Sequence, residues 1–211
     1  MKRIGITQRI EFDTAYAERR DCLDHQWFQV METLGFCGVP IPNNLVQPRT
    51  WLNAMHWDGF ILSGGNDVVS VPGAAGSTPE RARTEQAILD LARERTLPVF
   101  GVCRGLQMLN VHLGGSLSTR PDHVACRHAL LPCAGFPHFS AFREVNSFHG
   151  MVISSADLAG ELVATAHAPD GSVEAAEHRS LPWSGIMWHP EREAPLAEID
   201  LALMRHCFES G

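Results

Sequence analysis

The chain has 211 residues, of which 45% are apolar and 19% are charged, and it carries a net charge of −7 at pH 7. This length and apolar content suffice for a full hydrophobic core, so we expect one domain spanning residues 1–211. The negative charge argues against a nucleic-acid-binding surface, and no apolar stretch approaches the ~18 residues of a membrane span.

The cysteines and the N-terminus indicate the compartment. Six cysteines are scattered along the chain without a CxxC pair, and no apolar signal segment follows the first basic residues. We therefore expect a cytoplasmic protein with reduced thiols.

Strand and helix signals alternate in the first half of the chain. Short β-prone runs predict strands at residues 2–7, 36–41, 59–62 and 98–102. Apolar spacing predicts helices at 21–34, 78–95 and 104–113, and a proline-interrupted helical or irregular segment at 43–55. Gly35 and Gly114 end two of these helices, and Thr78 supplies a capping hydroxyl in front of Pro79. The alternation predicts an α/β fold with a doubly wound, mostly parallel sheet flanked by helices.

The pattern changes after the third expected helix. Shorter strands are expected at residues 116–118, around 145 and 152, and at 161–167, 173–178 and 185–189. A final helix is expected at 195–208. These strands predict a small additional β region beside the parallel sheet.

Cys103 lies between two glycines directly after a short apolar run, in the segment Gly101-Val102-Cys103-Arg104-Gly105. This pattern is typical of a nucleophile elbow, in which a strand turns sharply into a helix and glycines leave room for the turn. The partial positive charge of a helix N-terminus favours the thiolate, which is the reactive form. We interpret Cys103 as a nucleophile rather than as a structural thiol.

His189 and Glu191 provide a base and an acid two residues apart, again after an apolar run. Pro190 favours an extended backbone at His189, so the imidazole can face the elbow. There it would take the thiol proton and later protonate the leaving nitrogen, while Glu191 orients the ring.

The segment Ser63-Gly64-Gly65-Asn66 follows an expected strand. Its two glycines permit the backbone amides to point at a developing oxyanion. Alone this segment is a plain turn, but beside a nucleophile elbow it predicts an oxyanion hole formed by Gly64, Gly65 and the amide of Arg104.

Five residues of metal-binding types occur close together, at His123, Cys126, His128, Cys133 and His138. Their spacing fits no common zinc site. We therefore expect a histidine-rich loop beside the active site, with no metal and no cofactor.

Three ordered motifs resemble the class I glutamine amidotransferase-like superfamily across nearly the whole chain: LSGGND, GVCRGLQ with GGSL behind it, and MWHPE. The resemblance implies the flavodoxin-like fold of that superfamily, a triad of Cys103, His189 and Glu191, and a γ-glutamyl thioester at Cys103. It also implies that Gln107 and the segment Asn146-Ser147-Phe148-His149 hold the α-amino and α-carboxylate ends of the glutamyl group.

Arg104, directly after the nucleophile, resembles the stand-alone γ-glutamyl hydrolase branch of this superfamily. We expect a small-molecule γ-glutamyl substrate and no fused synthase domain; a homodimer stays open. Two alternatives stay open as well: a glutaminase subunit that delivers ammonia to a synthase, and a binding protein that has lost catalysis.

Four segments, at residues 5–9 and 19–24 and in VNSFHG and MWHPERE, resemble one narrower group in that branch, the γ-glutamyl-CDP-amidate hydrolases of capsular phosphoramidate synthesis. That resemblance implies cleavage of γ-glutamyl-CDP-amidate to glutamate and cytidine diphosphoramidate. The segments 39–48, 71–78 and 126–139 depart from the group's pattern, and such loops usually set the substrate. A γ-glutamyl-γ-aminobutyrate hydrolase is the alternative.

A nucleotide leaving group would require cationic contacts. Arg9, Arg104 and Arg127 are candidates, because a planar guanidinium pairs well with phosphate oxygens. For Arg9 a solvated surface position is an equal alternative, and for Arg127 it is the favoured one.

Overall fold

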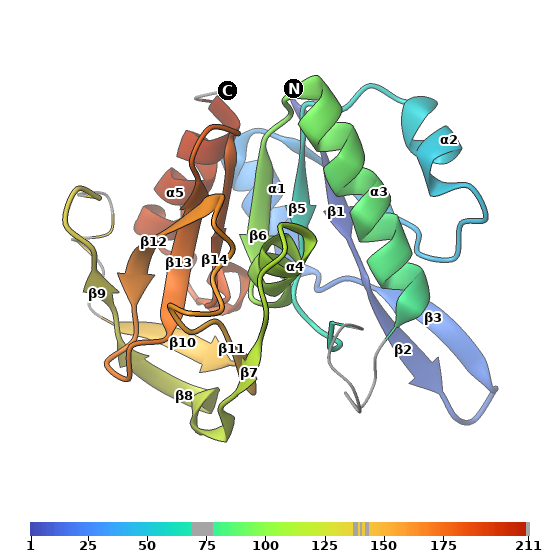
Figure 1. The fold of residues 1–211 in the computed structure, drawn as a ribbon. Helices are drawn as coiled ribbons and strands as arrows, with labels where there is room; N and C mark the ends of the chain where they lie inside the picture. Colours follow the sequence, from blue (N-terminus) through green and yellow to red (C-terminus); the bar gives the residue numbers. More distant parts are fainter. Residues whose placement is uncertain (69–77, 137–138, 140, 142–143, 210–211) are drawn as a thin grey trace.

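The computed structural model describes residues 1–68, 78–136, 139, 141 and 144–209, and its centre is an eight-stranded sheet (Figure 1). The first five strands in spatial order run parallel and the last three are antiparallel. In that order the strands are β4 (Cys37–Ile41), β1 (Arg3–Thr7), β5 (Gly59–Leu62), β6 (Val99–Val102), β14 (Trp183–Ile186), β13 (Val173–His178), β12 (Leu162–His167) and β9 (Leu131–Pro132). The predicted fold class, a mostly parallel sheet with a smaller β region, is confirmed.

Helices cover both faces of this sheet (Figure 1). One face carries α1 (Gln26–Leu34) and α5 (Glu198–Glu209), and the other carries α3 (Pro79–Arg95) and α4 (Arg104–His112), with α2 (Pro48–Asn53) packed beside α3. None of the helices in the described ranges combines the length and apolar character needed to cross a membrane.

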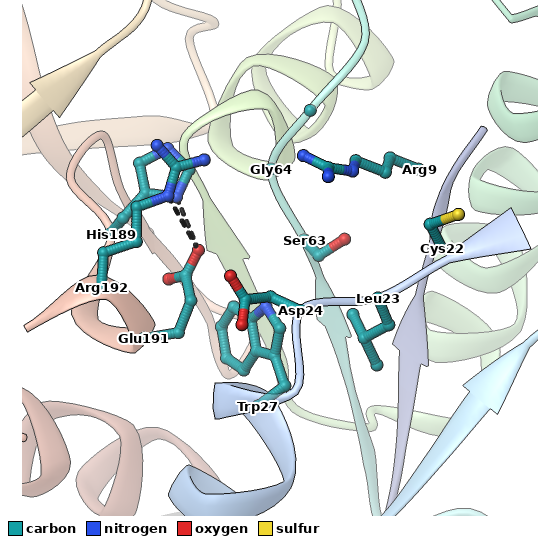
Figure 2. A pocket seen from close by; sticks show the side chains of 11 residues that line it. Arg9, Cys22, Leu23, Asp24, Trp27, Ser63, Gly64, His189, Glu191 and Arg192 are labelled. Atoms are coloured by element: carbon teal, nitrogen blue, oxygen red, sulfur yellow. Dashed lines mark hydrogen bonds and ion pairs between the residues drawn. The ribbon is translucent and has the colours of Figure 1, made fainter. Parts of the chain in front are cut away.

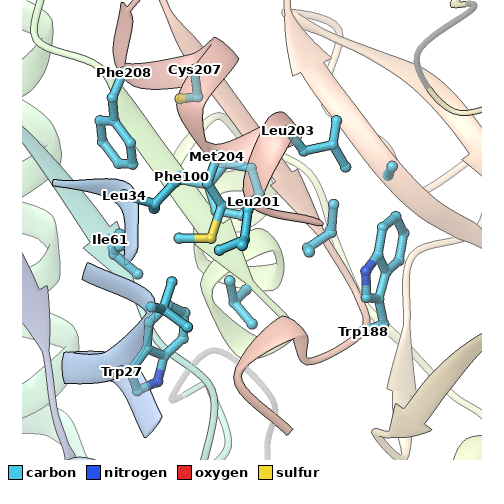
Figure 3. Close-up of a cluster of buried hydrophobic side chains, with 14 of the residues drawn as sticks. Trp27, Leu34, Ile61, Phe100, Trp188, Leu201, Leu203, Met204, Cys207 and Phe208 are labelled. Carbon is cyan, nitrogen blue, oxygen red and sulfur yellow. The ribbon is translucent and has the colours of Figure 1, made fainter. Parts of the chain in front are cut away.

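The side-chain alternation of the central strands divides the core into two layers. On β5, Ile61 packs toward the layer of α1 and α5, whereas Phe60 and Leu62 pack toward the layer of α3 and α4. Figure 3 shows the first layer, where Phe100 of β6 meets Met204 of α5. Strands buried on both faces read as continuous apolar runs, which is why the sequence marks them clearly.

Among the described residues, three two-stranded ribbons and two short 3-10 turns lie outside the main sheet. The ribbons pair β2 (Arg9–Asp13) with β3 (Glu18–Cys22), β8 (Val124–Ala129) with β10 (Glu144–Phe148), and β7 (Ser118–Thr119) with β11 (Met151–Val152). The turns are η1 (Pro121–His123) and η3 (Pro190–Arg192).

Several expected boundaries are wrong. The helix expected from residue 21 begins at Gln26, because β3 extends to Cys22 in the ribbon with β2. The strand expected at 185–189 is β14 at residues 183–186, since pairing with β6 sets its register, and the last helix begins at Glu198. Thr78 makes no side-chain capping bond, so α3 starts on the preset backbone angle of Pro79.

Candidate active site

The residues that follow three of the parallel strands lie at one edge of the sheet. Ser63 follows β5, Cys103 follows β6, and His189 lies three residues beyond β14. Because β5, β6 and β14 are adjacent and parallel, their carboxyl ends meet at the edge where doubly wound folds place their sites.

Cys103 occupies a strained turn between β6 and α4. Its backbone has φ 53° and ψ −107°, a region that residues other than glycine rarely adopt, and its amide donates to the carbonyl of Ile186 at 2.7 Å. A Cβ at Gly105 would lie 1.9 Å from the carbonyl oxygen of Leu62, so glycine is required for α4 to approach β5 this closely. The structure therefore has the strand-turn-helix geometry of a nucleophile elbow.

His189 is buried and held from both sides. Its Nδ1 lies 2.7 Å from Oε1 of Glu191, while the Asn146 side chain accepts from the His189 amide and donates to its carbonyl, both at 2.9 Å. Burial favours the neutral ring, but the neighbouring Cys103 and Glu191 outweigh it and raise the pKa of His189 to about 9. At neutral pH the ring therefore carries a proton beside the sulfur.

Arg81 orients the glycine loop after β5. This fully buried guanidinium donates to the carbonyls of Ser63, Gly64 and Gly65 at 2.6 to 2.9 Å. Because C=O and N–H point in opposite directions in a trans peptide, the amides of Gly64 and Gly65 point away from Arg81. Gly64 lies against His189, where a Cβ would come within 2.5 Å of the ring. This arrangement suits an oxyanion hole.

The Arg104 side chain does not face solvent. Its side chain is buried and pairs with Glu85, which also binds Arg81, so two arginines and one glutamate form a buried ionic network beneath the site. Nη1 of Arg104 is bound to Glu85, while Nε and Nη2 have no hydrogen-bond partner among the described residues and Arg104 lines the larger pocket, so its contact with a nucleotide diphosphate stays a prediction. The sequence signal for this network was the Arg-x-x-x-Glu spacing on α3, which puts both residues on one helix face.

Two pockets open beside His189. The larger is lined by residues that include Cys103, Gln107, Phe148, His149 and Arg192. The smaller is lined by residues that include Arg9, Asp24, Trp27, Gly64 and Glu191. Figure 2 shows His189, Glu191 and Arg192 on one side of the smaller pocket and Arg9 on the other.

The residues assigned to the glutamyl group separate into two sets. Gln107, Phe148 and His149 line the larger pocket. The ring centres of Phe148 and His189 lie 5.8 Å apart in an edge-to-face contact. Ser147 is fully buried, with its hydroxyl donating to the carbonyl of His123 at 2.6 Å, and Asn146 binds the His189 backbone. In the described part of the chain these last two side chains are absent from the lining of the larger pocket.

Arg192 is a pocket residue that the sequence analysis missed. It lines both pockets next to His189 and a third pocket near Arg127, and its guanidinium lies 4.4 Å from the centre of the Phe148 ring. Its position directly after Glu191 was the available signal. By contrast, Arg127 is paired with Glu193 at 2.8 Å.

The histidines and cysteines of the histidine-rich segment do not form a single cluster in the described part of the chain. Cys126 donates to the carbonyl of Asp122, and Cys133 lies 3.3 Å from Nδ1 of His167. His138 lies outside the described residues. His123 and His128 instead meet two residues that the sequence analysis did not group with them, His149 and Glu174.

The fold and this constellation define a glutamine amidotransferase-like protein. Superposition gives a TM-score of 0.73 with a proposed GMP synthase subunit of Thermoplasma acidophilum, at 18% identity, covering 99% of this chain and 93% of that one. A glutamine amidotransferase of Thermotoga maritima gives a TM-score of 0.66 at 16% identity, covering 99% and 84%. The resemblance deduced from the three motifs is thereby confirmed at the level of the fold.

The chain belongs to the peptidase C26 family, whose model matches residues 3–191, and it is a hydrolase of that family. It is 30% identical over 200 residues to the γ-glutamyl-CDP-amidate hydrolase of Campylobacter jejuni, covering 94% of each chain. It is 29% identical over 219 residues to the γ-glutamyl-γ-aminobutyrate hydrolase of Escherichia coli, covering 89% of this chain and 84% of the relative.

Proposed function

We propose that the protein hydrolyses a γ-glutamyl amide or phosphoramidate bond through a thioester at Cys103. The observations that carry this proposal are the strained turn that holds Cys103 after β6, and the buried His189 ring, which is paired with Glu191 at 2.7 Å and lines the same pocket as Cys103. A nucleophile, a base and an orienting acid in this order form the functional unit of cysteine hydrolases.

In the first half-reaction the Cys103 thiolate attacks the γ-carbonyl carbon. The developing oxyanion accepts hydrogen bonds from the amides of Gly64, Gly65 and Arg104. The C–N bond then breaks, and the proton on His189 passes to the leaving nitrogen, which departs neutral.

In the second half-reaction the neutral His189 takes a proton from water, and the hydroxide attacks the thioester carbon. The C–S bond breaks, glutamate is released, and the thiolate and imidazolium are restored. Glu191 holds the ring throughout, so we expect Glu191→Ala to retain weak activity whereas Cys103→Ala abolishes turnover.

We assign γ-glutamyl-CDP-amidate as the substrate, with glutamate and cytidine diphosphoramidate as products, in capsular phosphoramidate synthesis. Support comes from the match with the Campylobacter jejuni enzyme over 94% of both chains, and from Arg9 and Arg192 at the pockets beside His189. Guanidinium groups there suit a diphosphate. A γ-glutamyl-γ-aminobutyrate hydrolase is the second candidate, because that relative also matches along most of its length.

The test is glutamate release by the purified protein alone. L-Glutamine, γ-glutamyl-γ-aminobutyrate and γ-glutamyl-CDP-amidate are compared at matched concentrations, with Cys103→Ala as the blank. We expect the highest kcat/KM with γ-glutamyl-CDP-amidate. Preference for γ-glutamyl-γ-aminobutyrate would replace the substrate assignment, and activity that appears only with a synthase partner would replace hydrolysis by ammonia delivery.

A further inference from the structure

Three histidines and one glutamate lie close together beside the larger pocket, and one of them, His149, also lines that pocket. His123 ends η1, His128 lies on β8, His149 follows β10, and Glu174 lies on β13. One ring nitrogen from each histidine lies 3.6 Å from the same oxygen, Oε1 of Glu174. The four candidate ligand atoms all lie within 4.8 Å of one another.

The atoms of these four side chains that face one another are shielded from solvent and lack hydrogen-bond partners in the described part of the chain. The side chains of His149 and Glu174 are 2% and 0% exposed, and those of His123 and His128 are 8% and 13% exposed. Within the described ranges, the facing ring nitrogens and both Glu174 oxygens have no hydrogen-bond partner. A separation of 3.6 Å is too long for a hydrogen bond, and each unpaired buried polar atom costs roughly 1–3 kcal/mol.

The outer ring nitrogens decide which atoms face Glu174. Nδ1 of His128 lies 3.1 Å from the carbonyl of Ala129, and Nδ1 of His149 lies 3.1 Å from that of Met151. A carbonyl only accepts, so both rings carry a proton on Nδ1, and in the neutral rings Nε2 presents a lone pair to Glu174. In the third ring Nε2 of His123 lies 3.1 Å from a carboxylate oxygen of Asp170, which leaves Nδ1 facing inward.

We propose that His123, His128, His149 and Glu174 bind one divalent transition-metal ion of the zinc type. Lone pairs and a carboxylate that face one another repel unless a proton or another cation lies between them, and 3.6 Å is too long for a shared proton. Tetrahedral zinc with ligand bonds of about 2.0–2.1 Å places its ligand atoms about 3.3 Å apart, close to the 3.6 Å from each ring nitrogen to Glu174 and within the 4.8 Å that bounds all four atoms. Outer contacts to a carboxylate and to carbonyls are typical of metal-binding histidines.

Four protein ligands complete a tetrahedral shell, so the site is structural rather than catalytic. The ion fastens the β8–β10 ribbon to β13 of the main sheet. It also fixes the end of β10, because His149 follows Phe148 directly and the Phe148 ring packs on His189. The expectation of a metal-free histidine-rich loop is thereby replaced, with a different ligand set from the one that sequence proximity suggested.

The test uses untagged full-length protein, so that no affinity tag contributes histidines. Elemental analysis measures bound zinc in a Cys103→Ser background, which removes the catalytic thiol as a ligand. We expect one zinc ion per chain, and after its removal by a chelator we expect added Co²⁺ to give the visible absorption of a four-coordinate site. Metal-free protein with no such absorption would overturn the proposal.

Variants locate the ion. We expect His128→Gln and Glu174→Gln to lose the zinc, and His112→Gln on α4 to retain it. Asp170→Asn keeps all four ligands, so we expect folded protein with zinc affinity reduced 10- to 100-fold in a chelator competition. Unchanged affinity in Asp170→Asn, or zinc retained in Glu174→Gln, would place the ion elsewhere.

Discussion

Gly64 is a single residue that sets the position of His189, the proposed catalytic base. A Cβ there would lie 2.5 Å from Cε1 of His189, and the ring is fixed from behind by Glu191. We expect Gly64→Ala to displace the imidazole and lower kcat about 10²-fold, because small errors in placement are costly in catalysis. Steady-state kinetics measure the loss.

The matched control for that variant is Gly160→Ala. A Cβ at Gly160 meets nothing within 4 Å. We expect normal kcat in Gly160→Ala and an unchanged circular-dichroism spectrum in both variants. Normal turnover in Gly64→Ala would contradict the proposed role of His189.

The pH dependence of kcat/KM tests how Cys103 and Glu191 affect the protonation of His189. The pKa of His189 is raised to about 9, so the proton needed by the leaving nitrogen is present at pH 7 and is lost as the pH rises through 9. We expect kcat/KM to fall above pH 9. Glu191→Gln keeps an oxygen acceptor but removes the negative charge, so we expect the alkaline limb to move down by about one pH unit.

The shift of the alkaline limb distinguishes the orienting role of Glu191 from the effect of its negative charge. Cys103 and Glu191 both raise the pKa of His189, so a variant that retains the acceptor isolates the charge of Glu191. An alkaline limb at the same pH in wild type and Glu191→Gln would show that another group controls it.

Helix α5 is attached to the sheet through a buried carboxylate. Asp200 accepts from Nε1 of Trp188 at 2.8 Å, but burial raises the pKa of Asp200 to about 6 from its ordinary value of 3.8. A carboxyl with a higher pKa in the folded state destabilises the protein progressively as the pH rises from 3.8 through 6. At pH 7.5 the cost is about 3 kcal/mol.

We therefore expect Asp200→Asn to gain stability relative to wild type between pH 4 and pH 7.5, because asparagine keeps an oxygen for Trp188 and does not ionise. Urea unfolding at several pH values measures the difference. Asp90→Asn, at a largely exposed position on α3, is the control and should follow the wild type. If the free energy of unfolding changed with pH in the same way in wild type and Asp200→Asn, the raised pKa of Asp200 would be contradicted.

Helices α3 and α4 are joined by the Arg81–Glu85–Arg104 network. Burial lowers the pKa of Arg81 to about 10, and the two arginines lower the pKa of Glu85 despite its burial, so Arg81 and Glu85 are both charged at pH 7. Removing the one anion leaves two buried cations. We expect Glu85→Gln to lower the free energy of unfolding by about 3–5 kcal/mol.

An exposed pair between α2 and α3 provides the comparison. Glu94 binds Arg49 with its side chain 60% exposed. We expect Glu94→Gln to unfold at the same urea concentration as wild type, because exposed ion pairs contribute little. Equal unfolding midpoints for Glu85→Gln and Glu94→Gln would show that the buried network adds no stability.

At the scale of the whole molecule, cationic side chains from distant segments surround one site. Arg9 begins β2, Arg127 lies on β8 and Arg192 ends η3. Arg9 and Arg192 line pockets that His189 also lines, and Arg127 lines a further pocket that shares Arg192 with them. Arg9 and Arg127 each have an acidic partner within 2.8 Å, whereas the carboxylate oxygen paired with Arg192 lies 3.9 Å away. Arg192 is therefore the arginine most available to a diphosphate.

We expect Arg192→Gln to lower kcat/KM for γ-glutamyl-CDP-amidate about tenfold relative to kcat/KM for L-glutamine. The ratio of the two substrates cancels any effect on the shared chemistry, which matters because Arg192 also contacts Phe148. Arg179→Gln is the control, since Arg179 donates to Gly160 away from these pockets. An unchanged ratio in Arg192→Gln would remove this residue from the nucleotide site.

How far the sequence predicted the fold depends on burial. The strand at residues 59–62 was predicted with its observed bounds because all four residues are buried and apolar. The β2–β3 ribbon was missed because it is largely exposed and Glu18, Arg19, Arg20 and Asp21 show no alternation of apolar and polar residues. A ribbon held by backbone hydrogen bonds leaves little hydrophobic pattern to detect.

The sequence by itself determined the elbow at Cys103, the glycine loop and the pairing of His189 with Glu191, because backbone sterics and short spacing dictate these local features. Only the tertiary structure decided which distant side chains meet: Glu85 with Arg104, and Glu174 with three histidines. The reason is physical, since side-chain direction and strand register set such contacts, and residues 123, 128, 149 and 174 carry no common period along the chain.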